Sequence, residues 1–221
     1  MCFSAEASFV GAAVVGVVGV ATLTQVDEPK EVVYGSLPLA FAFHQLLEGM
    51  TWVQLDGSNE AALSGWWVHL WVIYAWALLP LWVPFGIWLI EPVARRRRWL
   101  FAFVLVGAAT LGVMMFGALQ QAIEVRVVES NLDYELPFSN ALLLAIPYVL
   151  TTCGSGLVSS FRWVRWFAVA NILALSSAAV MQAADFSSIW CTFAAFLSFL
   201  VFLHFREQRK KEVAIPVPSS A

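Results

Sequence analysis

Long apolar segments separated by short polar turns are the feature that most restricts the fold of this chain. A helix that crosses a membrane needs about 20 mostly apolar residues, at about 1.5 Å of rise each. The sequence contains seven such segments, at residues 5–26, 34–55, 62–90, 99–122, 138–157, 164–184 and 187–205. We therefore predict an all-α fold, an integral membrane bundle of seven transmembrane helices.

The composition excludes a soluble globular domain. Hydrophobic residues make up 61% of the 221 residues and charged residues only 12%, and the mean hydropathy is +0.78. This leaves too little polar surface to cover a water-soluble fold. The 3 cysteines are scattered and form neither a paired metal-binding motif nor a disulfide framework. No basic segment precedes the first apolar run, so we expect no cleaved signal peptide.

The positive charges predict the orientation of the bundle, because Lys and Arg accumulate in cytoplasmic loops. They cluster at residues 95–98, 162–165 and 206–211, which all fall on one side of a seven-helix bundle. We expect the N-terminus outside and the C-terminus in the cytoplasm. Residues 1–206 then form the transmembrane domain and residues 207–221 a disordered cytoplasmic tail. The basic clusters are interpreted as topology signals and lipid contacts, with no role in nucleic-acid binding.

The second apolar segment contains the stretch FHQLLEGMTW, residues 43–52, which holds an imidazole and a carboxylate at membrane depth. An ionisable group there costs at least a few kcal/mol, so it needs a partner, a water-filled pocket or a function. His44 and Glu48 are one turn apart and therefore share a helix face. If segments two and three form an antiparallel hairpin about residues 58 and 59, His69 lies level with Glu48. We predict that these side chains face the interior of the bundle.

Other polar residues fall in the same outer half of the membrane and predict an outward-facing pocket. Around His44, Glu48 and His69 these residues are Cys2, Glu6, Gln121, Asp185 and Cys191. Cysteine, histidine and carboxylate side chains are the usual zinc ligands, and three of them with an open position activate water for hydrolysis. Cys2, His44, Glu48 and His69 are the candidate metal ligands, with Glu48 the candidate catalytic residue and zinc the candidate cofactor.

Two further interpretations of these residues stay open. They form either a hydrogen-bonded network that holds the helices together or a pocket that handles a proton or a ligand. A disulfide between Cys2 and Cys191 is a further hypothesis, since both are expected at the outer face. Packing alone explains Gly19, Gly107 and Gly112, because small residues let membrane helices approach closely.

Several blocks of sequence resemble those of an uncharacterised bacterial family of multi-pass membrane proteins whose members open with MCFSA. The blocks are MCFSAEASF at 1–9, QLLEGMTW at 45–52, LPLWVPFGIWLIEP at 79–92, TTCGSGLVSSFRWVRWF at 151–167 and SIWCTFAAFLSFLVFLHFR at 188–206. The resemblance covers nearly the whole chain and implies a bacterial cytoplasmic membrane protein, but no activity. Within the pocket it emphasises Cys2, Gln45, Glu48 and Cys191.

Three functional hypotheses follow from the pocket. The protein is an intramembrane metal-dependent hydrolase, a proton-coupled transporter or sensor, or a structural or partner-binding membrane protein. The expected partners are the lipid bilayer and a small-molecule or lipid ligand. The sequence does not predict the oligomeric state.

Overall fold

The computed structural model describes residues 4–55, 65–128, 131–134, 141–181 and 186–213, and almost all of these are helical. In chain order the elements are α1 (Ala5–Leu23), η1 (Pro29–Glu31), α2 (Val32–Gly35), α3 (Leu37–Leu55), α4 (Trp66–Val72), η2 (Ile73–Leu78), α5 (Leu79–Ile90), α6 (Ala94–Gln120), β1 (Val125–Val128), β2 (Asn131–Tyr134), α7 (Ala141–Val149), η3 (Leu150–Gly154), α8 (Ser155–Val158), α9 (Arg162–Met181) and α10 (Phe186–Val213).

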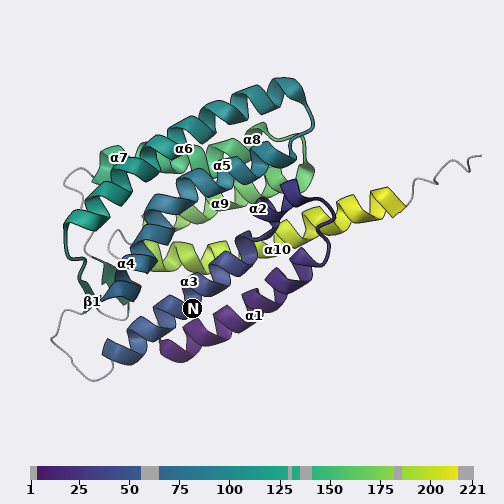
Figure 1. Ribbon diagram of the computed structural model, residues 1–221. Helices are drawn as coiled ribbons and strands as arrows, with labels where there is room; N and C mark the ends of the chain where they lie inside the picture. Colours follow the sequence, from purple (N-terminus) through teal and green to yellow (C-terminus); the bar gives the residue numbers. More distant parts are fainter. Residues whose placement is uncertain (1–3, 56–64, 129–130, 135–140, 182–185, 214–221) are drawn as a thin grey trace, which may run out of the picture.

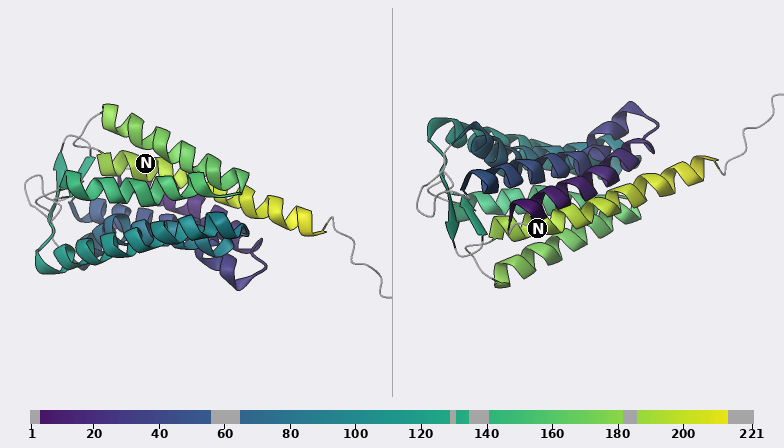
Figure 2. Two further views of the ribbon diagram at one scale, coloured as in Figure 1. Left: turned by 90° about the horizontal axis from the view of Figure 1, so that it is seen from above. Right: turned by 90° about the horizontal axis from the view of Figure 1, so that it is seen from below.

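Within these residues the helices form seven rods that lie side by side (Figures 1 and 2). The third rod joins α4, η2 and α5, and the fifth joins α7, η3 and α8. Three helices are long and apolar enough to cross a membrane, namely Ala5–Leu23, Trp66–Ile90 and Ala94–Gln120, while Leu143–Val158 is apolar but shorter. The helical architecture is therefore as predicted, and three of the seven rods have the length and composition of membrane spans.

The ends of α1 and α10 can be compared directly with the sequence predictions. Ser4 caps α1, because its Oγ accepts a hydrogen bond from the backbone N–H of Ala7 at 3.2 Å. The disorder predicted to begin at Glu207 is wrong for residues 207–213, because α10 continues as a helix to Val213. Glu207 itself bonds to α9, and these contacts favour the helix over an unfolded tail.

The three basic clusters lie together at one end of the bundle. Arg96, in the first turn of α6, donates a hydrogen bond to the carbonyl oxygen of Ser159 at 2.7 Å, just before α9. Arg162 of α9 pairs with Glu207 of α10 at 3.1 Å. Arg209 of α10 in turn donates to the carbonyl oxygen of Thr24, at the end of α1. These contacts link four rods at this end, which we call the basic end.

A β-hairpin lies at the opposite end and is the main departure from the all-α prediction (Figure 1). Strands β1 and β2 pair antiparallel, with Val125 opposite Tyr134. Tyr134 is buried and stacks on Trp71 of α4, with ring centroids 3.7 Å apart and an interplanar angle of 5°. The connection between the fourth and fifth apolar segments thus contains a hairpin that packs against α4.

Close helix crossings occur at two of the predicted glycines. A Cβ atom on Gly19 of α1 would lie 2.8 Å from the backbone nitrogen of Leu39 of α3. A Cβ atom on Gly107 of α6 would lie only 2.1 Å from the carbonyl oxygen of Pro80. Gly112 differs, because a Cβ atom there would meet nothing within 4 Å. The packing explanation is therefore confirmed for Gly19 and Gly107 and is wrong for Gly112.

The sides of the bundle are strongly apolar. Large hydrophobic side chains are exposed along several rods, including Val17 of α1 at 71%, Phe43 of α3 at 50%, Val113 of α6 at 55% and Ile146 of α7 at 65%. Soluble monomers rarely expose apolar surface of this extent, which is typical of contact with lipid or another apolar partner. Polar and ionisable groups are concentrated at the two ends and in the interior.

Candidate functional site

The interior face of α3 carries four polar side chains in its second half. His44 and Gln45 are each 1% exposed, and Glu48 and Thr51 are both fully buried. His44 and the adjacent Gln45 lie four and three residues before Glu48, and Thr51 lies three after it, so the four form one stripe on a single face of the helix. Thr51 Oγ1 donates to the carbonyl oxygen of Leu47 at 2.9 Å, a common arrangement for a hydroxyl inside a helix. The burial predicted for His44 and Glu48 is confirmed.

The imidazole of His44 is held between aromatic rings of the third rod. Its centroid lies 4.6 Å from that of Trp71 and 4.9 Å from that of Tyr74, both at tilted angles. The imidazole also interacts with the backbone of Trp71. Its Nε2 is buried and has no hydrogen-bond partner among the described residues. At least one ring nitrogen of His44 is therefore without a hydrogen-bond partner among the described residues.

Gln45 adds a second open group to the same stripe. Its Oε1 is buried and has no hydrogen-bond partner among the described residues. An unsatisfied polar atom away from water costs about 1–3 kcal/mol. Two adjacent residues of this stripe therefore each carry one buried polar atom without a hydrogen-bond partner among the described residues.

Helices α1 and α10 both pack against α3 and each other around this stripe. The ring of Phe9 is so close to Gly49 that a Cβ atom there would lie 2.7 Å from it. This contact sets the first turns of α1 level with Glu48. Ser8 of α1 and Ser198 of α10 are fully buried, so each helix contributes a hydroxyl to the interior. We call His44, Gln45 and Glu48 with this surrounding the α3 site.

His69, near the hairpin end, makes two contacts of its own. Its Nδ1 is 3.1 Å from the carbonyl oxygen of Gly65, and its Nε2 is 3.3 Å from the carbonyl oxygen of Gln121. The ring therefore links the start of α4 to the residue after α6. Gln121 contributes its backbone to this contact, and its side chain is exposed.

The remaining predicted pocket residues divide into two groups. Glu6 is exposed in the first turn of α1. Cys2, Asp185 and the side chain of Cys191 fall outside the described residues. Among the residues that the structure describes, no three His, Cys, Asp or Glu side chains come together as a metal site. The α3 site supplies two residues of that kind, His44 and Glu48.

A second buried carboxylate was not predicted as part of any cluster. Glu91, which follows α5 at the basic end, is 2% exposed. Its Oε1 accepts from Ser160 Oγ at 2.7 Å, and its Oε2 accepts from the N–H of Ser160 at 2.8 Å and from Ser159 Oγ at 3.2 Å. Arg165 binds the carbonyl oxygens of the same two serines at 3.0 and 2.9 Å. The cluster ties α5 to the turn before α9.

His204 is a further buried imidazole, and its surroundings are aromatic. It is 2% exposed, and its ring lies edge-on to Tyr34 at 5.9 Å and to Phe161 at 4.7 Å. It lies within α10, which extends nine residues beyond it, to Val213. Its Nδ1, like Nε2 of His44, is buried and has no hydrogen-bond partner among the described residues.

Comparison with curated proteins and with solved structures found no similar protein. A family model does match, and it spans residues 1–216 of the 221. The matched region includes every helix described above, as well as Cys2, the α3 site and the Glu91 cluster. The chain therefore belongs to the family of unknown function DUF6629.

Proposed function

We propose that this chain is a seven-span protein of the bacterial cytoplasmic membrane, with its N-terminus outside and its C-terminus in the cytoplasm. The apolar sides of the rods and the three candidate spans support insertion in a membrane. The gathering of Arg96, Arg162, Arg165 and Arg209 at one end supports a cytoplasmic location for that end. The hairpin and the nearby α3 site then belong to the outer half.

We propose further that the α3 site binds a divalent metal ion of the zinc class. The observation that carries this proposal is the buried Nε2 of His44, which has no partner among the described residues, one helical turn from Glu48. Metal-binding imidazoles are usually oriented through their other nitrogen by a carbonyl or carboxylate. The interaction of His44 with the Trp71 backbone fits that pattern.

The additional ligands in this proposal come from the N-terminal residues and from the region around the start of α10. Cys2 is the first choice, with Asp185 and Cys191 as the other groups of suitable chemistry, because zinc accepts sulfur, nitrogen and oxygen ligands. His69 is left out, since both of its ring nitrogens lie near carbonyl oxygens. A bound zinc ion with an open position supplies Lewis acidity and an activated water for hydrolysis. Glu48 would hold or move a proton beside the bound metal ion.

Metal analysis of protein purified in detergent without chelator tests the metal site. We expect stoichiometric metal in the wild type and its loss in Cys2→Ser, His44→Gln and Glu48→Gln. The matched controls are His204→Gln and Glu91→Gln, which change a buried imidazole and a buried carboxylate at the other end and should keep the metal. A metal-free wild type would overturn the proposal, as would equal loss in the controls.

Proton-coupled transport or sensing is the second candidate function. It is favoured by one observation, namely that an acid and an imidazole lie one turn apart in a fully buried position. In this case Glu48→Gln abolishes proton uptake by reconstituted vesicles, and uptake that survives the substitution excludes the hypothesis. A purely structural role is tested by Glu48→Leu, which should then lower the melting temperature. An unchanged melting temperature contradicts that role.

A further inference from the structure

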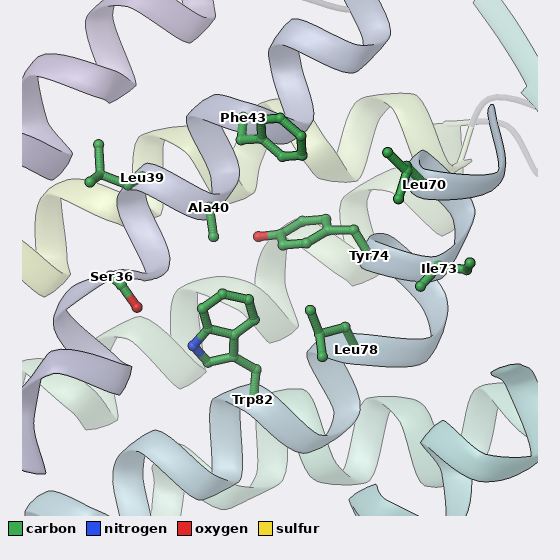
Figure 3. A pocket seen from close by; sticks show the side chains of 9 residues that line it. All are labelled: Ser36, Leu39, Ala40, Phe43, Leu70, Ile73, Tyr74, Leu78 and Trp82. Atoms are coloured by element: carbon green, nitrogen blue, oxygen red, sulfur yellow. The ribbon is translucent and has the colours of Figure 1, made fainter. Parts of the chain in front are cut away.

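A groove opens on the side of the bundle between α3 and the third rod (Figure 3). Its volume is about 420 Å³, within the range of about 300–1,000 Å³ that is usual for small-molecule sites. The lining is almost wholly apolar and comprises Ser36, Leu39, Ala40, Phe43, Leu70, Ile73, Tyr74, Leu78 and Trp82.

The position of the groove determines what can reach it. It lies on the side of the rods and not at either end, and its rim residues Phe43 and Leu70 are 50% and 37% exposed. Leu46 and Val53, further along α3, are also exposed and continue the same apolar surface. In a membrane this side faces acyl chains, so hydrocarbon is the medium that fills the groove.

The inner wall of the groove is also a wall of the α3 site. Tyr74 lines the groove, and its ring lies 4.9 Å from the imidazole of His44 on the other side. Trp82 and Phe41 support Tyr74 edge-on, each at 6.3 Å. The ring of Tyr74 thus borders the lipid-facing groove and also contacts the imidazole of His44.

Tyr74 belongs to η2, a π-helical segment at Ile73–Leu78. Such segments insert an extra residue into a helix and occur frequently at functional sites. In this rod the π-helical turn contributes three of the lining residues, Ile73, Tyr74 and Leu78. The local irregularity therefore coincides with the groove.

We propose that this groove binds the acyl chain of a membrane lipid and that the ligand of the α3 site is consequently a lipid. The groove is lined from Ser36, the residue before α3, to Phe43 of α3, and His44 to Glu48 of the α3 site follow in the sequence. A chain lying in the groove therefore directs the polar end of the lipid toward the hairpin end, to the level of His44 and Glu48. This inference rests on the proposed function, because it names the substrate class of the same site.

Photolabelling in vesicles tests the groove. Vesicles of phosphatidylethanolamine and phosphatidylglycerol carry a trace of lipid with a diazirine in its acyl chain, and labelled peptides are mapped by mass spectrometry. We expect label concentrated on Leu39, Phe43 and Leu78. Ala40→Phe fills the groove and Leu70→Trp obstructs its rim, and each should lower this labelling about tenfold, which corresponds to about 1.4 kcal/mol of binding free energy.

Val17→Phe is the matched control, because Val17 is 71% exposed on the outer side of α1 and leaves the groove unchanged. Labelling spread evenly over α1, α3 and α6, or equal labelling in all variants, overturns the lipid subsite. Metal analysis of the same samples separates the two proposals. Focused labelling of a metal-free wild type supports the groove and contradicts only the metal site, whereas metal-loaded protein with even labelling contradicts only the groove.

Discussion

The hydroxyl of Tyr148 donates a hydrogen bond of 2.7 Å to the carbonyl oxygen of Ala75, 73 residues away in the sequence. Ala75 lies in η2, where the carbonyl of residue i pairs with the N–H of residue i+5. Its partner in that register is Pro80, which has no N–H. Tyr148, from the fifth rod, therefore satisfies a buried carbonyl that the proline leaves open.

Removing this hydroxyl should destabilise the fold. We expect Tyr148→Phe to lower the free energy of unfolding by about 1–3 kcal/mol, because it leaves a buried carbonyl unsatisfied. Tyr34→Phe is the control, since Tyr34 is fully buried but its hydroxyl has no partner among the described residues. Thermal or denaturant unfolding in detergent measures both, and equal effects of the two substitutions would contradict the assignment.

Two glycines of α6 should respond in opposite directions to the same change. In Gly107→Ala the new methyl group meets the Pro80 carbonyl oxygen, and overpacking of this kind costs about 1–3 kcal/mol or more. Gly112→Ala meets nothing and should gain up to about 1 kcal/mol from the higher helix propensity of alanine. The melting temperatures of the two variants give the comparison, and a stable Gly107→Ala would show that the crossing of α6 with the third rod is looser than described.

Glu91 should be far more important for stability than an exposed carboxylate. Glu91→Ala removes the acceptor of three hydrogen bonds from Ser159 and Ser160, and we expect a loss of at least about 2 kcal/mol. Glu124→Ala, which breaks an exposed pair with Arg126, should change stability by less than about 1 kcal/mol. Equal shifts of the unfolding curves of Glu91→Ala and Glu124→Ala would contradict this prediction.

The contact between α10 and α9 should weaken in acid. The ammonium group of Lys211 and the indole N–H of Trp163 both donate hydrogen bonds to the carboxylate of Glu207. These bonds, with that of Lys211 the stronger effect, hold the pKa of the Glu207 carboxyl below its ordinary value of 4.5. Because the folded pKa is the lower one, the stabilisation is fully present above the unfolded pKa and is lost as the pH falls through the folded pKa.

Melting temperatures of wild type and Glu207→Gln should therefore differ by a constant amount above about pH 6 and converge below about pH 4. Lys211→Met removes the main cause of the lowered pKa and should reduce the pH dependence. A difference between wild type and Glu207→Gln that persists unchanged at about pH 3 would contradict this account.

The sequence predicted the features that depend on strong, local patterns. The long apolar segments predicted the helical rods. The positions of the basic clusters predicted that these clusters lie at the same end of the bundle. The spacing of His44 and Glu48 gave a shared interior face, because ionisable groups in an apolar helix must turn away from lipid. Whether these residues act together with Cys2 stays a prediction.

Other features depend on long-range contacts that carry no local signal. The hairpin at Val125–Tyr134 has short strands with charged residues, and its pairing is supported by Trp71, far away in the sequence. In the sequence Glu91 has no feature that marks it as buried, and only the fold places Ser159 and Ser160 next to it. The hydrogen bond from Tyr148 to the Ala75 carbonyl oxygen in the π-helical turn likewise joins residues 73 positions apart in the sequence.

The flat contact between Tyr134 and Trp71 connects the hairpin directly to the interior of the bundle. Trp71 also touches His44, so two ring contacts run from a strand beyond the helices to the imidazole. A molecule that displaces the hairpin from outside would release one side of Trp71 and change the surroundings of His44. The hairpin therefore covers one end of the bundle and is also coupled to the imidazole inside it.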